Sequence, residues 1–216
     1  MFLRLSLKYS IIIPTLNEEK LLPNLLKQLN DDKLRNLYDI EIIISDGGSI
    51  DSTIETALKF SEIVKVHNLK KKQNIAEGRN IGAKLASGGI FIFLNGDILL
   101  PNVHTFFDYI DKNFTNNLKY DAMTCKVKVF PNEEKTVDKV FHFAFNFYFK
   151  LLNVLGMGMG RGECQIVRKN VFNMVQGYNE TLAAGEDYDL FKRIKKIRDI
   201  LFTNKICVYE SPRRYR

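Results

Sequence analysis

The chain has 216 residues, of which 45% are hydrophobic and 26% charged, and its formal net charge is +7. This length suits one substantial domain with a core of its own. The positive charge favours anionic partners such as nucleotide diphosphates, phospholipid surfaces or nucleic acid, and charge alone does not choose among them. Cys125, Cys164 and Cys207 are odd in number and lack CxxC spacing, so we expect reduced thiols rather than a disulfide framework or a zinc site.

The amino-terminal segment is too short and too interrupted by polar residues for a secretory signal peptide. No apolar run reaches the length of about 18 residues that a transmembrane helix needs. We therefore expect a cytoplasmic protein, with association at the cytoplasmic face of a membrane as an open alternative.

Strand and helix patterns alternate through the first half of the chain. Apolar runs predict strands over 9–14, 40–45, 63–67 and 90–94, and helical periodicity predicts helices over 17–29, 52–60 and 75–86. This alternation indicates parallel strands joined by right-handed crossovers. We predict an α/β fold, a single Rossmann-like domain over 1–216 whose mostly parallel central sheet is flanked by helices.

The second half is less regular. Strands are predicted over 121–130 and 201–209, a helix is predicted to run from Glu186 through Ile200, and an aromatic-rich helix is predicted over 137–155. The aromatic helix has three open interpretations, which are a buried helix, a dimer interface and an interfacial helix that docks on a membrane or receives a lipid-linked acceptor.

Polar residues follow several of the predicted strands directly. Asp46 ends the second strand, and Asn95 and Asp97 follow the fourth, where open α/β sheets bind their ligands. Asp46 can accept a hydrogen bond from a nucleotide base. Asp97 is a hard oxygen ligand that suits Mg²⁺ or Mn²⁺ carrying a nucleotide diphosphate, whereas a simple turn is the alternative for the Asn-Gly-Asp sequence. For Asp51, near the next helix, we favour a helix N-cap.

Glu186 and Asp187 open a helix whose last turns are basic. The helix macrodipole alone explains this distribution of charge. The alternative is functional, because the preceding loop, 177–185, is bounded by glycines and suits the presentation of a carboxylate into a cleft. Such a carboxylate could deprotonate an acceptor hydroxyl.

Five motifs then occur in a definite order, namely SIIIPTLNEE at 10–19, SDGGSIDST at 45–53, GRNIG at 78–82, NGD at 95–97 and GED at 185–187. Together they resemble the family 2 glycosyltransferases with the GT-A fold, over residues 8–212. The resemblance implies a nucleotide-binding half at 8–97, an acceptor-binding half at 98–212 and a basic tail at 213–216.

The resemblance also implies roles for single residues. Substrate binding is implied for Pro14, Thr15, Glu18, Asp46, Arg79, Asn95, Glu186, Arg213 and Arg214, metal binding for Asp97, and general-base catalysis for Asp187. Within that set, Asp46 contacts the base, Asn95 lies beside the ribose or the metal, and the two arginines of the tail are candidates for the diphosphate. Arg79 lies near the base or the diphosphate, with a helix-surface pair with Asn80 as its alternative.

The implied reaction is inverting transfer of one sugar from a UDP- or GDP-linked donor, with Mn²⁺ or Mg²⁺, to a hydroxyl or phosphate acceptor that is a glycan or lipid-linked. No nucleic acid partner is implied. Asn95 departs from the Asp-x-Asp pattern and removes one negative charge, and the absent Gln-x-x-Arg-Trp motif argues against a processive synthase. Two alternatives remain, a catalytically inactive module that binds a nucleotide sugar and a nucleotidyltransferase. The second lacks the expected Gly-rich, Lys-containing loop after the first strand.

Overall fold

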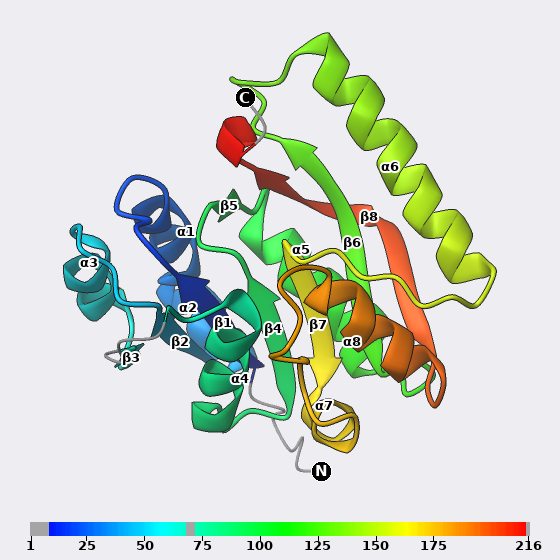
Figure 1. Cartoon of the computed structure of the whole chain (residues 1–216), viewed down its shortest axis with the longest axis horizontal. Coiled ribbons are helices and arrows are strands. Elements are labelled where there is room, and N and C mark those ends of the chain that lie inside the picture. Colours follow the sequence, from blue (N-terminus) through cyan, green and yellow to red (C-terminus); the bar gives the residue numbers. More distant parts are fainter. Residues whose placement is uncertain (1–8, 68–71, 215–216) are drawn as a thin grey trace.

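An eight-stranded sheet organises the molecule, with its strands in the order β3-β2-β1-β4-β7-β6-β8-β5 (Figure 1). The computed structural model describes residues 9–67 and 72–214. The strands are β1 (Tyr9–Thr15), β2 (Ile40–Asp46), β3 (Ile63–Val66), β4 (Ile90–Leu94), β5 (Ile98–Leu99), β6 (Ala122–Val129), β7 (Cys164–Arg168) and β8 (Ile200–Glu210).

Helices cover both faces of this sheet. They are α1 (Leu22–Leu29), α2 (Asp32–Tyr38), α3 (Thr53–Phe60), α4 (Ile75–Leu85), α5 (Val103–Ile110), α6 (Thr136–Val154), α7 (Lys169–Met174) and α8 (Glu186–Lys195), with a π-helical turn η1 (Asp111–Thr115) and a 3₁₀ turn η2 (Pro212–Arg214). One hydrophobic cluster packs α1, α2 and α5 against one face, and a second packs α4, α7 and α8 against the other. None of the helices in the described ranges is both long and apolar enough to cross a membrane.

The first half is the parallel part of the sheet. β1 pairs in parallel with both β2 and β4, and β2 pairs in parallel with β3. The register places Thr15 beside Asp46, so the polar residues that end these strands meet at one edge. β4 is apolar throughout and fully buried, as expected for a central parallel strand. The predicted α/β fold with a mostly parallel sheet is confirmed.

β7 is one of two strands, with β5, that the sequence did not predict. It runs antiparallel to β4 and to β6, and all five of its residues are buried. Gln165 and Arg168 interrupt its apolar run, and the rest of the structure satisfies both side chains. Gln165 accepts a hydrogen bond from the Tyr178 hydroxyl, and Arg168 donates to the carbonyl oxygen of Phe114.

Two predicted helix boundaries were wrong. The helix that opens at Glu186 ends at Lys195 rather than continuing through Ile200, which instead begins β8 beside β6. The first helix begins at Leu22 rather than near residue 17, because Asn17 has a left-handed backbone (φ 54°) and Pro23 suits a helix start. The helices α2, α5 and α7 were not predicted.

The helix cap after β2 also differs from the prediction. The N-cap of α3 is Ser52, one residue later than the predicted Asp51. The Asp51 carboxylate still accepts hydrogen bonds from the backbone N–H of Thr53, the first residue of the helix, and from that of Glu19. Asp51 therefore stabilises both the helix start and the loop after β1.

Candidate active site

A cavity of about 480 Å³ opens at the carboxyl ends of β1 and β2. Its walls come from the loop after β1, the start of α4 and the C-terminal turn, and the lining residues are Pro14, Thr15, Leu16, Asn17, Glu18, Gly47, Gln73, Asn74, Ile75, Gly78 and Arg213. Four of the predicted substrate-binding residues are among them. Gln73 and Asn74 were not predicted, because nothing in the sequence marks this part of the chain as close to β1.

Asp46 is fully buried, does not line this cavity, and holds its own loop in place. One carboxylate oxygen accepts from the backbone N–H groups of Gly48 (2.9 Å) and Ser49 (2.7 Å). The other accepts from the hydroxyls of Thr15 (2.8 Å) and Ser49 (2.6 Å). A base could therefore reach Asp46 only by replacing one of these donors, most simply the Ser49 hydroxyl. The predicted contact with a base stays a prediction.

Arg213 connects the loop after β1 with the loop after β4. Its guanidinium donates to the carboxylate of Glu18 and lies 3.3 Å from the Asp97 carboxylate. Both acids are almost completely buried, whereas 39% of the Arg213 side chain is exposed. A strongly held positive charge therefore sits between two acids at the rim of the cavity.

The donor atoms around Asp97 suit a divalent cation that arrives with its substrate. Among the described residues, no group of three or more His, Cys, Asp or Glu is arranged to hold a metal by itself. Mg²⁺ in nucleotide sites is commonly bound through one or two carboxylates, and phosphate oxygens and waters complete the shell. Asp97 and Glu18 supply two such carboxylates. The Arg213 guanidinium contacts both of them, so these two acids can accommodate a positive charge between them.

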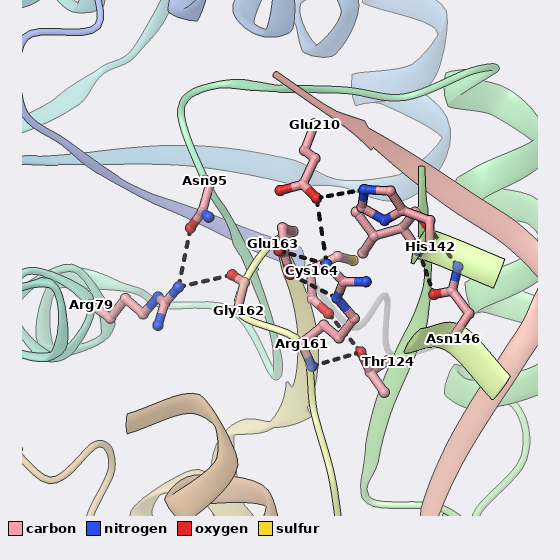
Figure 2. Close-up of polar contacts among 11 residues, drawn as sticks. Arg79, Asn95, Thr124, His142, Asn146, Arg161, Gly162, Glu163, Cys164 and Glu210 are labelled. Carbon is pink, nitrogen blue, oxygen red and sulfur yellow. Dashed lines mark hydrogen bonds and ion pairs between the residues drawn. The ribbon is translucent and has the colours of Figure 1, made fainter. Parts of the chain in front are cut away.

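Arg79 is a buried cation that joins three segments from distant parts of the chain, and Figure 2 shows its contacts with Asn95 and Gly162. Its guanidinium donates to Glu186 (2.7 Å), to the side-chain oxygen of Asn95 (3.1 Å) and to the carbonyl oxygen of Gly162 (2.8 Å). Its guanidinium carbon also lies 5.1 Å from the ring centre of Tyr178. Arg79 does not line the cavity, so its predicted role near the base or diphosphate stays a prediction.

The Arg79 contacts explain why a neutral residue is tolerated at position 95. Glu186, on the first turn of α8, already supplies a carboxylate to the buried guanidinium. A second buried carboxylate at position 95 would therefore exceed the available positive charge, and uncompensated buried charge is costly. The Asn95 amide accepts the hydrogen bond without adding a charge.

Asp187 follows Glu186 and is partly buried at the start of α8. Burial raises the pKa of its carboxyl group to about 6, with the nearby Glu186 carboxylate raising it further and Arg79 opposing the shift. One of its oxygens accepts from the backbone N–H of Tyr188 (2.9 Å). A carboxylate with this pKa is ionised at neutral pH yet more basic than an ordinary aspartate, as general-base catalysis requires.

Gly162 is a part of the site that the sequence prediction missed. A Cβ atom at this position would lie 3.1 Å from the second Asp187 carboxylate oxygen and 3.2 Å from an Arg79 nitrogen. Gln165 of β7 contributes from the same side, because its side-chain nitrogen donates to the Asp187 carbonyl oxygen (3.2 Å). The glycines around residue 162 were the available sequence signal.

A second buried polar cluster lies behind Gly162, between β7, β8 and α6 (Figure 2). Arg161 pairs with Glu163 through two nitrogens, at 2.9 and 3.2 Å, and lies 3.5 Å from Glu210. The His142 ring lies 3.4 Å from the same Glu210 oxygen. Burial together with the Glu163 charge raises the pKa of Glu210 to about 8.

Contacts therefore link most of the predicted site residues into two neighbouring groups. Arg213 joins Glu18 to Asp97, and Arg79 joins Asn95 to Glu186, the neighbour of Asp187. Arg214 lies in η2, but its side chain is outside the described residues. A separate cavity of about 630 Å³ lies near α4, α7 and the loop after α7, and none of the predicted site residues lines it.

Comparison with known proteins identifies the family. The model of glycosyl transferase family 2 matches residues 10–173. A 4,4'-diaponeurosporenoate glycosyltransferase from Staphylococcus haemolyticus (strain JCSC1435) is 37% identical over 101 residues, which make up 44% of this chain. The same match covers 25% of that relative, so this chain spans a limited part of its length.

Two solved structures share the fold. The crystal structure of S. aureus TarS 1-349 in complex with UDP-GlcNAc has a TM-score of 0.68 and 22% identity, over 94% of this chain and 58% of that one. The mannosyltransferase PcManGT from Pyrobaculum calidifontis, in complex with GDP-Man and Mn²⁺, has a TM-score of 0.69 and 15% identity, over 94% and 56%. Because the family model matches most of its length, this chain belongs to glycosyl transferase family 2.

Proposed function

We propose that this domain transfers one sugar from a nucleoside diphosphate sugar to a hydroxyl or phosphate acceptor, with inversion at the anomeric carbon. The observation that carries the proposal is the position of Asp187. Its carboxyl group, with a pKa raised to about 6, lies beside the buried contacts that join α8 to the end of β4. This position would hold a general base next to the edge of the sheet where open α/β folds bind their ligands.

The cavity at the ends of β1 and β2 is the proposed site for the nucleotide. Its volume of about 480 Å³ is in the range of small-molecule sites. The two structural neighbours described above bind UDP-GlcNAc and GDP-Man, so both bases remain candidates. Asp46 would accept from the base after the Ser49 hydroxyl turns away, while its two backbone hydrogen bonds keep the loop in place.

The diphosphate is proposed to lie against Arg213 and Asp97. A guanidinium pairs bidentately with phosphate oxygens, and the partly exposed Arg213 side chain can exchange its acid partners for them. Asp97, with Glu18 beside it, would hold Mn²⁺ or Mg²⁺. The metal, when bound, stabilises the negative charge that develops on the departing diphosphate.

Asp187 is proposed to act as the general base. The acceptor oxygen forms a bond to the anomeric carbon from the face opposite the diphosphate, and its proton passes to the Asp187 carboxylate. The bond between the anomeric carbon and the phosphate oxygen breaks with both electrons leaving on the nucleoside diphosphate, through an oxocarbenium-like transition state. Arg79, Gln165 and Gly162 position the base and take no part in the bond changes.

Donor hydrolysis tests this proposal without knowledge of the acceptor. We expect release of UDP or GDP from a matching nucleotide sugar in the presence of Mn²⁺, and loss of release in Asp97→Ala and Asp187→Asn. Asp189→Asn is the matched control, because this second aspartate of α8 pairs with Arg193 outside the proposed site. Unchanged release in both site variants would disprove the assigned roles.

The alternative of an inactive binding module gives a different result. Such a module is stabilised thermally by the nucleotide sugar but releases no nucleoside diphosphate. A screen of UDP- and GDP-linked sugars for a rise in melting temperature, with and without Mn²⁺, therefore identifies the donor and precedes the hydrolysis assay. The nucleotidyltransferase alternative gains no support, since residues 14–18, at the end of β1 and directly after it, contain neither glycine nor lysine.

A further inference from the structure

The long helix α6 buries polar side chains and exposes apolar ones over much of its length, whereas Phe149 and Leu152 are buried near its end. Asp138, His142 and Asn146 form a stripe at intervals of four residues, and all three are buried. The outer side combines Lys139 and Lys150 with exposed apolar residues, which are Val137, Val140, Phe141, Phe143, Phe147, Tyr148, Leu151 and Val154. A surface helix normally buries its apolar stripe, and exposed apolar patches of this kind mark interaction sites.

The buried polar stripe has a structural cause. β7 pairs with β6 only as far as Thr124, so one edge of β6 lacks a strand partner from there on. Asn146 supplies the missing hydrogen bonds, accepting from the backbone N–H of Val127 (3.0 Å) and donating to its carbonyl oxygen (2.8 Å). In Figure 1, α6 accordingly runs alongside β6 and β8. Between Asp138 and Asn146, α6 is thus attached through polar side chains, and most of its aromatic residues stay exposed.

A cationic cavity of about 600 Å³ adjoins this aromatic side. Lys126 and Lys128 of β6 and Lys139 and Lys150 of α6 contribute its charges, and Phe143 and Phe147 contribute apolar wall. Glu134 is the one acidic residue in the lining, and it lies 3.7 Å from Lys139. Burial and the nearby Arg161 lower the pKa of His142, so this residue adds no charge at neutral pH.

We propose that α6 and this cavity form a docking site for the phosphate headgroups of an anionic membrane. The lysines bind headgroup phosphates, and the exposed aromatic residues enter the boundary between headgroups and acyl chains. A second copy of the chain fits this surface less well. A symmetric pair buries the same patch from both copies, and would therefore bring four lysines of one copy against the same four of the other.

This inference goes beyond the proposed sugar transfer and does not depend on it. The test is flotation with vesicles of phosphatidylcholine alone or mixed with phosphatidylglycerol. We expect the wild-type chain to float only with the anionic vesicles, and less at high salt. Lys126→Gln/Lys128→Gln should lower the partition coefficient about 25-fold, because each lysine near an anionic surface contributes a factor of about five.

Substitution of the aromatic residues tests the apolar part of the site. Phe143→Ser/Phe147→Ser should lower the partition coefficient by about tenfold or more, because both side chains are exposed and free to enter the bilayer. Matched controls lie on the other side of the molecule. The control for the loss of charge is Lys27→Gln/Lys33→Gln, on α1 and α2. The control for the loss of apolar surface is Leu37→Ser/Leu58→Ser, on α2 and α3, where both leucines are exposed.

Three outcomes would overturn the proposal. The first is a wild-type chain that stays with the soluble fraction in the presence of anionic vesicles. The second is an equal loss of binding in the control variants, which would indicate attraction by net charge alone. The third is a wild-type chain that forms a dimer in sedimentation equilibrium and does not bind vesicles, while the Phe143→Ser/Phe147→Ser variant is a monomer. That result would show that the exposed side of α6 binds a second copy of the chain. Unchanged melting temperatures verify that the variants fold.

Discussion

Asp187→Asn should make the protein more stable while it removes the proposed catalytic base. The folded protein holds the Asp187 carboxyl group at a pKa of about 6, against an ordinary value of 3.8, because burial and Glu186 disfavour its charged form. Above about pH 6 the folded state must carry this unfavourable charge. Asparagine has nearly the same shape, can still accept the hydrogen bond from Tyr188, and is neutral.

The magnitude follows from the two pKa values. Below about pH 4 the carboxyl group is protonated in both the folded and the unfolded state, so the substitution should change the free energy of unfolding little. Between about pH 4 and 6 the unfolded state loses its proton first, and wild-type stability falls relative to the variant. Above about pH 6 the difference levels off near an upper value of about 3 kcal/mol, from 1.36 kcal/mol for each unit of pKa difference. For a chain of this size, that corresponds to a rise in melting temperature of about 6–12 °C.

Urea unfolding of both proteins near pH 4 and pH 8 measures this difference, and donor hydrolysis measures the cost to catalysis. We expect hydrolysis to fall by about 10²–10⁴-fold, the usual contribution of a general base. In the wild type, the rate should rise with pH through about 6 as the carboxylate ionises. A variant that is equally stable to wild type at both pH values would refute the reasoning, because the carboxyl group would then have an ordinary pKa.

Three further predictions concern the surroundings of Asp187 and the proposed donor site. Glu186→Gln should lower the free energy of unfolding, measured with urea, by about 3–5 kcal/mol, because it leaves the buried Arg79 guanidinium without its carboxylate partner. A loss below about 1 kcal/mol would show that the pair behaves like an exposed one. Gly162→Ala should lower kcat for donor hydrolysis and cost about 1–3 kcal/mol of stability, since its methyl group would crowd Asp187 and Arg79; wild-type kcat would argue against the close approach. Arg213→Ala should raise KM for the nucleotide sugar at least about tenfold, as expected for a lost charged hydrogen bond. Arg213→Lys keeps the charge and should recover part of the affinity. Equal KM values in the wild type and both variants would show that Arg213 does not bind the donor.

The parallel half of the fold was predictable because its signals are local. Ile90–Leu94 is an uninterrupted apolar run beside glycine, and the leucines of 21–29 repeat at helical spacing. The carboxyl ends of parallel strands meet at one edge, so the order of the motifs was enough to bring Thr15 and Asp46 together. β7 was missed because Gln165 and Arg168 break its apolar pattern, and their partners are 13 or more residues away in sequence.

The centre of the site was less predictable, for a physical reason. An arginine on a helix is usually solvated, and Arg79 is buried because Glu186 and Gly162, 107 and 83 residues away, surround its guanidinium. The outward aromatic face of α6 has a similar origin. The sequence left open whether those aromatics were buried or exposed, and the answer depends on where β7 parts from β6. Such features follow from tertiary contacts and have no local sequence signal.

The order in which the site can assemble follows from its longest contacts. Arg213 meets Glu18 across 195 positions, and β8 enters the sheet between β6 and β5, both of which precede it in the chain. During synthesis the strands β1 to β4 emerge first and can form their parallel part of the sheet, since domains begin to fold from their amino-terminal part. The acids at their ends acquire their cationic partner only when β8 is in place and η2 has emerged. A nascent chain therefore completes the proposed nucleotide cavity last, and chains truncated before residue 213 should fold the first strands without binding the donor.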